Sequence, residues 1–193
     1  MDILEQIKMR RTIRKYRPQK IDESILKDLV DCGRLAPSAS NRQPLEFFVV
    51  QKGELLEPVF HTLSWAGFIS PEGTPREGEK PVAYIVVLMK KELDHPMVRS
   101  DVGAAIENIL LAAGNYGIGG CWIGSVRRKE LARILQVPED RAIVDVVALG
   151  YPAETPVAEE AKESLRYYKD DHQALHVPKR PLETILHMDR WQV

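Results

Sequence analysis

The chain is poor in cysteine and has no long hydrophobic run. Its 193 residues include two cysteines, Cys32 and Cys121, so we expect reduced thiols rather than a disulfide framework. Cys121 has no local base, which favours a small buried side chain over a nucleophile. The longest strongly apolar run, residues 82–89, is too short to span a bilayer. Without an apolar signal-peptide region at the N-terminus, we expect a cytoplasmic protein.

The side-chain motifs of several enzyme classes are also missing. The sequence contains no Gly-Lys-Ser/Thr of a P-loop and no Gly-x-Ser-x-Gly nucleophile elbow. Gly117 and Gly119 are followed by Trp122, where a dinucleotide fingerprint needs its third glycine. His172 and His176 have the spacing of one helix face, but nothing nearby completes a metal site, so metal binding is a minor alternative. If the chain is an enzyme, a cofactor carries its chemistry.

Positive charge is concentrated in one short segment. The chain holds 27 Lys and Arg against 28 Asp and Glu, and this balance argues against a general polyanion binder. Yet Lys8–Lys20 contains seven basic residues and no acid. Arg10, Thr12 and Arg14 alternate there, so in an extended segment they would point the same way toward one anion. A solvated surface is the competing interpretation. A second basic segment, residues 177–181, can converge on the same anion.

Hydrophobic periodicity predicts helices that alternate with strands. The expected helices cover residues 2–9, a segment that begins after Asp22 as N-cap, residues 101–116 and residues 126–137. The expected strands cover residues 45–51, 82–89 and 141–151. The second strand lacks alternation, which predicts a central strand covered on both faces. The helix over 101–116 is apolar on nearly every side, which predicts burial, partly against another subunit. An α/β or α+β domain follows.

Five sequence blocks together resemble the FMN-dependent nitroreductase family. They occur in the family's order, as R-R-T-I-R-K-Y (10–16), A-P-S-A-S-N-R-Q-P (36–44), D-V-G-A-A-I-E-N-I-L-L-A-A (101–113), G-I-G-G-C-W-I-G (117–124) and V-P-K-R-P-L-E (177–183). The resemblance implies one α+β domain over residues 1–193. It would be a three-layer sandwich with a central mixed, mostly antiparallel sheet flanked by helices, assembled as a domain-swapped homodimer.

The resemblance also implies FMN as cofactor and assigns residues to it. Arg10 and Thr12 would hold the phosphate, and Arg14 would reach the pyrimidine edge of the ring, with Arg11 contributing backbone. The loop that one subunit lends to the flavin of the other would comprise Pro37, Ser38, Ala39, Ser40 and Asn41. The stretch along the ring would comprise Gly119, Gly120, Trp122, Ile123 and Gly124. Lys179 and Arg180 would form a C-terminal phosphate clamp, with Arg180 the preferred assignment.

The function implied is that of an NAD(P)H-dependent oxidoreductase. NADH or NADPH would reduce the flavin and leave, and a small-molecule acceptor such as a nitroaromatic or a quinone would follow in a ping-pong cycle. Two segments depart from the family pattern: residues 53–80, and residues 155–176, which we expect to be an insertion. A flavin-binding or flavin-delivering protein without NAD(P)H turnover is one alternative. A nucleic-acid-binding domain that uses Lys8–Lys20 is another.

Overall fold

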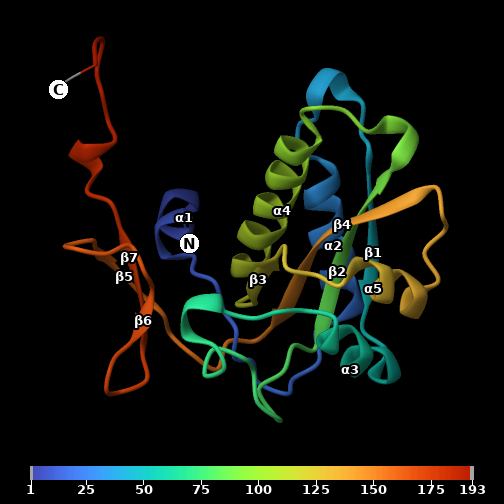
Figure 1. The fold of residues 1–193 in the computed structure, drawn as a ribbon, viewed down its shortest axis with the longest axis horizontal. Helices are drawn as coiled ribbons and strands as arrows, with labels where there is room; N and C mark the ends of the chain where they lie inside the picture. Colours follow the sequence, from blue (N-terminus) through green and yellow to red (C-terminus); the bar gives the residue numbers. More distant parts are fainter. Residues whose placement is uncertain (1, 192–193) are drawn as a thin grey trace.

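Between residues 23 and 150, helices and strands alternate along the chain in the computed structural model, which describes residues 2–191 (Figure 1). The helices are α1 (Ile3–Met9), α2 (Glu23–Arg34), α3 (Gly53–His61), α4 (Val98–Asn115) and α5 (Arg128–Leu135). The strands are β1 (Leu45–Val50), β2 (Ala83–Lys90), β3 (Gly119–Ile123), β4 (Arg141–Gly150), β5 (Val157–Glu160), β6 (Tyr168–Lys169) and β7 (Leu175–Lys179). The elements expected from periodicity are confirmed, with ends shifted by up to about three residues.

The main sheet has four strands in the order β1-β2-β4-β3, and all three pairings are antiparallel. The central position predicted for residues 82–89 is confirmed, because β2 lies between β1 and β4 and is buried from Ala83 to Met89. Parallel pairing occurs outside this sheet, between β5 and β7 and at an isolated bridge from Thr12 to Gly120.

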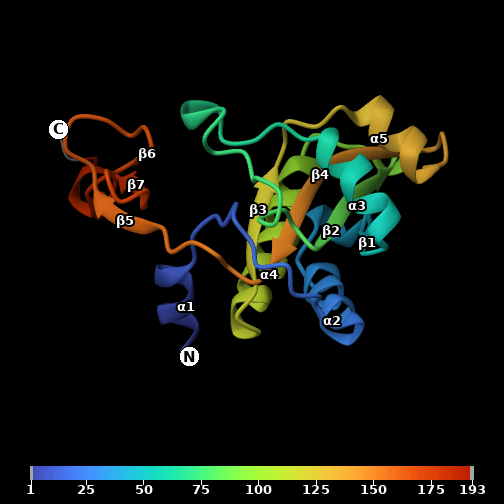
Figure 2. The same ribbon diagram turned by 90° about the horizontal axis from the view of Figure 1, so that it is seen from below.

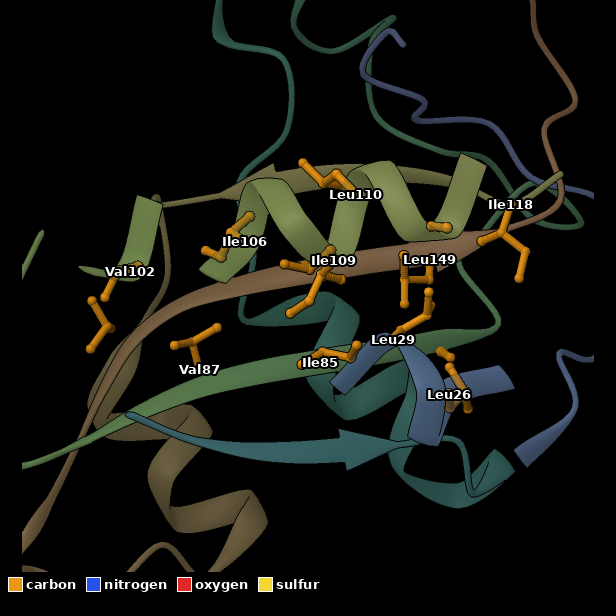
Figure 3. Packing of buried hydrophobic residues seen from close by; sticks show 14 of the residues in the cluster. Leu26, Leu29, Ile85, Val87, Val102, Ile106, Ile109, Leu110, Ile118 and Leu149 are labelled. Carbon is orange, nitrogen blue, oxygen red and sulfur yellow. The ribbon is translucent and has the colours of Figure 1, made fainter. Parts of the chain in front are cut away.

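Alternate residues of β2 enter two separate hydrophobic clusters, one on each face of the sheet. Ile85 and Val87 pack with α2 and α4, and this cluster is shown in Figure 3. Tyr84 and Val86 pack with side chains of α3 and α5 on the other face. The result is three layers, helices–sheet–helices, which are visible in the turned view of Figure 2. A strand buried on both faces needs apolar residues at every position, which explains its lack of alternation.

The C-terminal part of the chain forms a second, small sheet in the order β5-β7-β6, on the side of α1 (Figures 1 and 2). The expected insertion, residues 155–176, contributes β5 and β6. A shared helix face for His172 and His176 is wrong, because His172 lies in a turn and His176 in β7. Within residues 2–191, no cluster of His, Cys, Asp and Glu is arranged to hold a metal ion. No described helix combines the length and apolarity needed to cross a bilayer.

Truncation of Ile85 to alanine tests the two-sided burial of β2. Ile85 is fully buried, so we expect Ile85→Ala to lower the free energy of unfolding by about 2–5 kcal/mol in urea denaturation. Leu35→Ala is the control, because Leu35 is 64% exposed and its truncation should change stability by less than about 0.5 kcal/mol. Equal effects of the two substitutions would contradict this packing.

Candidate functional site

The segment after α1 lies directly on the glycine-rich strand β3. Thr12 forms a parallel bridge with Gly120, and the backbone N–H of Ile13 donates to the Gly120 carbonyl at 3.0 Å. A Cβ atom at Gly119 would stand 2.5 Å from Cγ1 of Ile13, a distance that no real Cβ contact tolerates. Glycine is therefore required at this position for the segment to approach the sheet.

Buried contacts hold the same segment in its extended form. The backbone N–H groups of Arg14 and Lys15 donate to one carboxylate oxygen of Glu154, at 2.6 and 3.2 Å. The fully buried Tyr16 donates its hydroxyl to the Ile13 carbonyl at 2.5 Å, and burial raises the pKa of this phenol well above its usual value. These contacts fix the backbone of the segment, and with it the direction in which each basic side chain points.

These side chains line a cavity of about 430 Å³ that joins the two ends of the chain. Its walls are Ile7, Arg10, Arg11, Thr12, Arg14, Tyr167, Val177 and Lys179. The structure thus brings Arg10, Thr12 and Arg14 together with Lys179 of β7. Arg180 points elsewhere: it is exposed, and its Nη2 donates to the Thr184 carbonyl at 2.9 Å.

The cavity has an excess of positive charge that its own walls do not neutralise. Arg10 pairs with Glu107 of α4 at 3.0 Å, but the wall contains no acidic residue. Burial and then the neighbouring Arg10 guanidinium lower the pKa of Arg11 below its usual value. The Nε atom of Arg14 is buried and, within residues 2–191, has no hydrogen-bond partner. With four cationic side chains and no acid in its wall, the cavity favours an anionic ligand.

Tyr167 covers Arg14 and was not among the residues assigned from sequence. The Arg14 guanidinium lies 5.3 Å from the centre of the Tyr167 ring, a cation–π contact. The Tyr167 hydroxyl accepts from the backbone N–H of Phe68 at 3.2 Å, and the two rings are 5.0 Å apart. Residues 53–80 and 155–176, the two segments without a match to the family pattern, therefore meet beside the cavity. The only signal in the sequence is the cluster Arg166-Tyr167-Tyr168.

The predicted loop Pro37–Asn41 lies away from this cavity. It contains the short turn η1 (Ala39–Asn41), at the top of Figure 1. Pro37 and Ser38 border a separate cavity of about 130 Å³ above α2 and α4. Ser40 and Asn41 both have a left-handed backbone with φ of 53°, which is uncommon for residues other than glycine. Among the described residues, the two groups of candidate residues thus border two different cavities.

The remaining predicted residues lie along β3 and just beyond it. Trp122 is 41% exposed, and its indole N–H donates to the buried carboxylate of Asp145 at 2.8 Å. Ile123 is buried in the cluster on the α3 and α5 face, and Gly124 is exposed. Gly119 and Gly120 border a cavity of about 300 Å³ that also reaches Arg10 and Arg11.

Comparison with known proteins decides the family. The sequence model of the Nitroreductase family matches residues 7–151 of this chain. The chain belongs to the nitroreductase family. These nitroreductases are oxidoreductases, and the match covers the N-terminal segment, the Pro37–Asn41 loop and β3. It ends before β5, so Tyr167 and Lys179 lie outside the matched region.

Relatives and solved structures agree with this membership. A Methanothermobacter thermautotrophicus protein, provisionally named NADH dehydrogenase/NAD(P)H nitroreductase, is 34% identical over 161 residues, which are 81% of this chain and 80% of the relative. An FMN-dependent nitroreductase of Clostridium difficile R20291 has the same fold, with a TM-score of 0.71, 23% identity and coverage of 97% and 99%. The NADPH:FMN oxidoreductase of Vibrio harveyi, solved with NAD⁺, gives a TM-score of 0.68 at 22% identity, with coverage of 99% and 78%. The expected α+β nitroreductase fold is confirmed.

The environment of Cys121 predicts an inert thiol next to the candidate site. Burial raises the pKa of Cys121 to about 11, against a smaller opposite effect of Arg14. At pH 8 only about one such thiol in a thousand is ionised, and the thiolate is the reactive form. We expect iodoacetamide to spare Cys121 in the native protein and to modify it in urea, with mass spectrometry as the readout. Rapid native labelling of Cys121 would contradict this environment.

Proposed function

We propose that this nitroreductase binds FMN and uses NADH or NADPH to reduce small-molecule acceptors. The observation that supports it most is the cavity that joins Arg10, Thr12 and Arg14 to Lys179, with a buried, unpartnered Nε on Arg14. This donor set matches a ligand with a phosphate at one end and a flat, acceptor-rich ring at the other. FMN has both.

Different residues of the cavity would bind different parts of FMN. Arg10, Thr12 and Lys179 would hold the phosphate, because guanidinium forks, a hydroxyl and an ammonium group all donate to its oxygens. Arg14 would place its guanidinium at the pyrimidine edge of the ring, where a positive charge favours the reduced, anionic form. Tyr167 would help to hold that guanidinium in place through the cation–π contact. The stretch Gly119, Gly120 and Trp122–Gly124 would run along the ring.

The side chains of this protein would bind, orient and exclude water rather than react. Bound FMN would supply the redox chemistry, hydride transfer from a nicotinamide to a second substrate in a ping-pong order. Nitroaromatics and quinones are the acceptor classes we propose. Phe68 and Tyr167, whose rings lie 5.0 Å apart and are tilted by 51°, offer an aromatic surface beside the cavity to such flat molecules.

The second group of candidate residues would serve the flavin of a partner subunit, in a domain-swapped homodimer. In the described part of the chain, Pro37 and Ser38 of the loop border a different cavity from the one that Arg10–Arg14 line. Two segments also expose apolar side chains that a monomer would leave in water. They are α1, with Ile3, Leu4, Ile7 and Met9, and the C-terminal segment, with Leu182, Ile185, Leu186, Met188 and Trp191. A two-fold pairing would cover them and complete two equal sites.

The visible spectrum of the purified protein tests the flavin. We expect a yellow protein, or an apoprotein that turns yellow with FMN and is bleached by NADH or NADPH under anaerobic conditions. Arg10→Ala should raise the Kd for FMN about tenfold to a hundredfold, because it removes charged hydrogen bonds to the phosphate. Arg17→Ala is the matched control, since Arg17 is exposed and lies outside the cavity, and its Kd should match the wild type.

Three outcomes would point elsewhere. A colourless protein that does not take up FMN would refute the proposed cofactor. FMN binding without bleaching by either nicotinamide would support the flavin-delivery alternative. Salt-dependent affinity for DNA or RNA in a colourless protein would support the nucleic-acid alternative that uses Lys8–Lys20.

The proposed dimer predicts that subunit separation releases flavin. Ile3→Glu together with Leu4→Glu places two charges on exposed apolar residues of α1 that do not border the cavity, so we expect sedimentation velocity to show a shift toward monomer, with loss of bound FMN. Lys129→Glu on the exposed face of α5 is the control and should leave both unchanged. A monomer that retains FMN would show that the Pro37–Asn41 loop is not needed from a partner.

A further inference from the structure

We propose that Asp101, oriented by His95, is a positioning residue for the flavin, because it holds the Pro37–Asn41 loop in its binding shape. The inference rests on the proposed function, in which that loop contacts FMN. Asp101 lies in the first turn of α4, and His95 lies in the turn just before that helix. Neither residue borders the cavity that contains Arg14.

The loop is tethered to the rest of the protein at one point. In the described part of the chain, residues 37–43 make a single hydrogen bond to a residue outside the loop: the backbone N–H of Ala39 donates to Oδ1 of Asp101 at 2.9 Å. Their other hydrogen bonds stay within the loop, such as that from the Gln43 N–H to the Ser38 hydroxyl at 3.0 Å. A cavity of about 130 Å³ lies under the loop, so packing gives it little further support.

The backbone of the loop needs such a tether. Ser40, Asn41 and Gln43 have φ values of 53°, 53° and 48°, all in the left-handed region. Each such residue is disfavoured in a free chain and persists where the surroundings hold it. The Ala39–Asp101 bond comes immediately before Ser40 and Asn41, so it fixes the loop where the unusual conformation begins.

The hydrogen bonds around Asp101 require a carboxylate rather than an amide. The backbone N–H of Met97 donates to Nδ1 of His95 at 3.2 Å, so the ring proton is on Nε2. Nε2 lies 3.1 Å from Oδ2 of Asp101 and donates to it. Two donors therefore face the two oxygens of Asp101, one from His95 and one from Ala39. An asparagine would place its own NH₂ against one of them.

Burial makes the loss of either hydrogen bond to Asp101 costly. The His95 and Asp101 side chains are 6% and 5% exposed, so water cannot easily replace a lost partner. The N-terminal end of α4 further favours a negative charge at Asp101. His95 sets the orientation of the Asp101 carboxylate, and this carboxylate holds the backbone N–H of Ala39 through one charge-assisted hydrogen bond.

The experiment compares FMN binding by four full-length proteins. Asp101→Asn places an NH₂ group against one of the two donors, and Ala39→Pro removes the donor from the loop side. Proline is tolerated after Ser38, whose ψ of 152° is extended. Asp94→Asn is the matched control, because Asp94 is exposed and makes no side-chain hydrogen bond among the described residues. We expect both test variants to raise the Kd for FMN at least about tenfold, measured by flavin fluorescence well below the melting temperature of each apoprotein.

Turnover at saturating FMN distinguishes a positioning role of Asp101 from a purely structural role in the fold. Because Asp101 does not border the proposed flavin cavity, saturating FMN should restore turnover of Asp101→Asn to within about threefold of the wild type. Wild-type Kd values in both test variants would overturn the inference while leaving the proposed function intact. A rate that stays low at saturating FMN would also overturn it, in favour of a purely structural role. If the wild type binds no FMN, the proposed function fails and this inference fails with it.

Discussion

The arrangement of this protein depends on the close approach of residues 10–16 to the strand β3. The approach is possible because Gly119 has no side chain, and it is fixed by the Ile13–Gly120 hydrogen bond and by burial of Tyr16. An extended chain alternates its side chains. With Ile13 held against β3, Thr12 and Arg14 are presented to the cavity instead. The absence of a side chain at Gly119 thus allows the close approach that places the basic side chains at the cavity.

The basic segment separates into structural and ligand-directed charges once its neighbours are known. Lys15 pairs with Glu79 at 3.3 Å and does not border the cavity. Lys8, Arg17 and Lys20 are exposed, as a solvated surface predicts. Arg10, Arg11 and Arg14 border the cavity, and the wall holds no acidic residue, since Glu107, the partner of Arg10, lies outside it. Segregated charge of this kind is unfavourable by itself and becomes favourable when an anion binds. This is the physical reason to connect the segment with a phosphate-bearing cofactor.

The sequence was sufficient for features with a local signal and insufficient for contacts between distant segments. The burial of β2 was predictable from its unbroken apolar run. The alternation of Arg10, Thr12 and Arg14 indicated one row, but it did not predict that Arg11 borders the same cavity. No local pattern shows that Tyr167 makes a cation–π contact with Arg14, or that Lys179 and not Arg180 borders the cavity, because each depends on how β6 and β7 return to the N-terminal segment. The spacing of His172 and His176 was misleading for the same reason, since a strand and a turn can imitate helical spacing.

The separation of the candidate residues into two groups has a thermodynamic consequence. If the Pro37–Asn41 loop of one subunit and the Arg10–Arg14 segment of the other contact the same flavin, only the dimer contains a complete site. Binding and association are then linked, so FMN stabilises the dimer by the same factor by which association tightens FMN binding. The Ala39–Asp101 tether enters this linkage directly. A loop already held in its left-handed conformation loses less entropy when the partner's flavin docks against it, which lowers the free-energy cost of both steps.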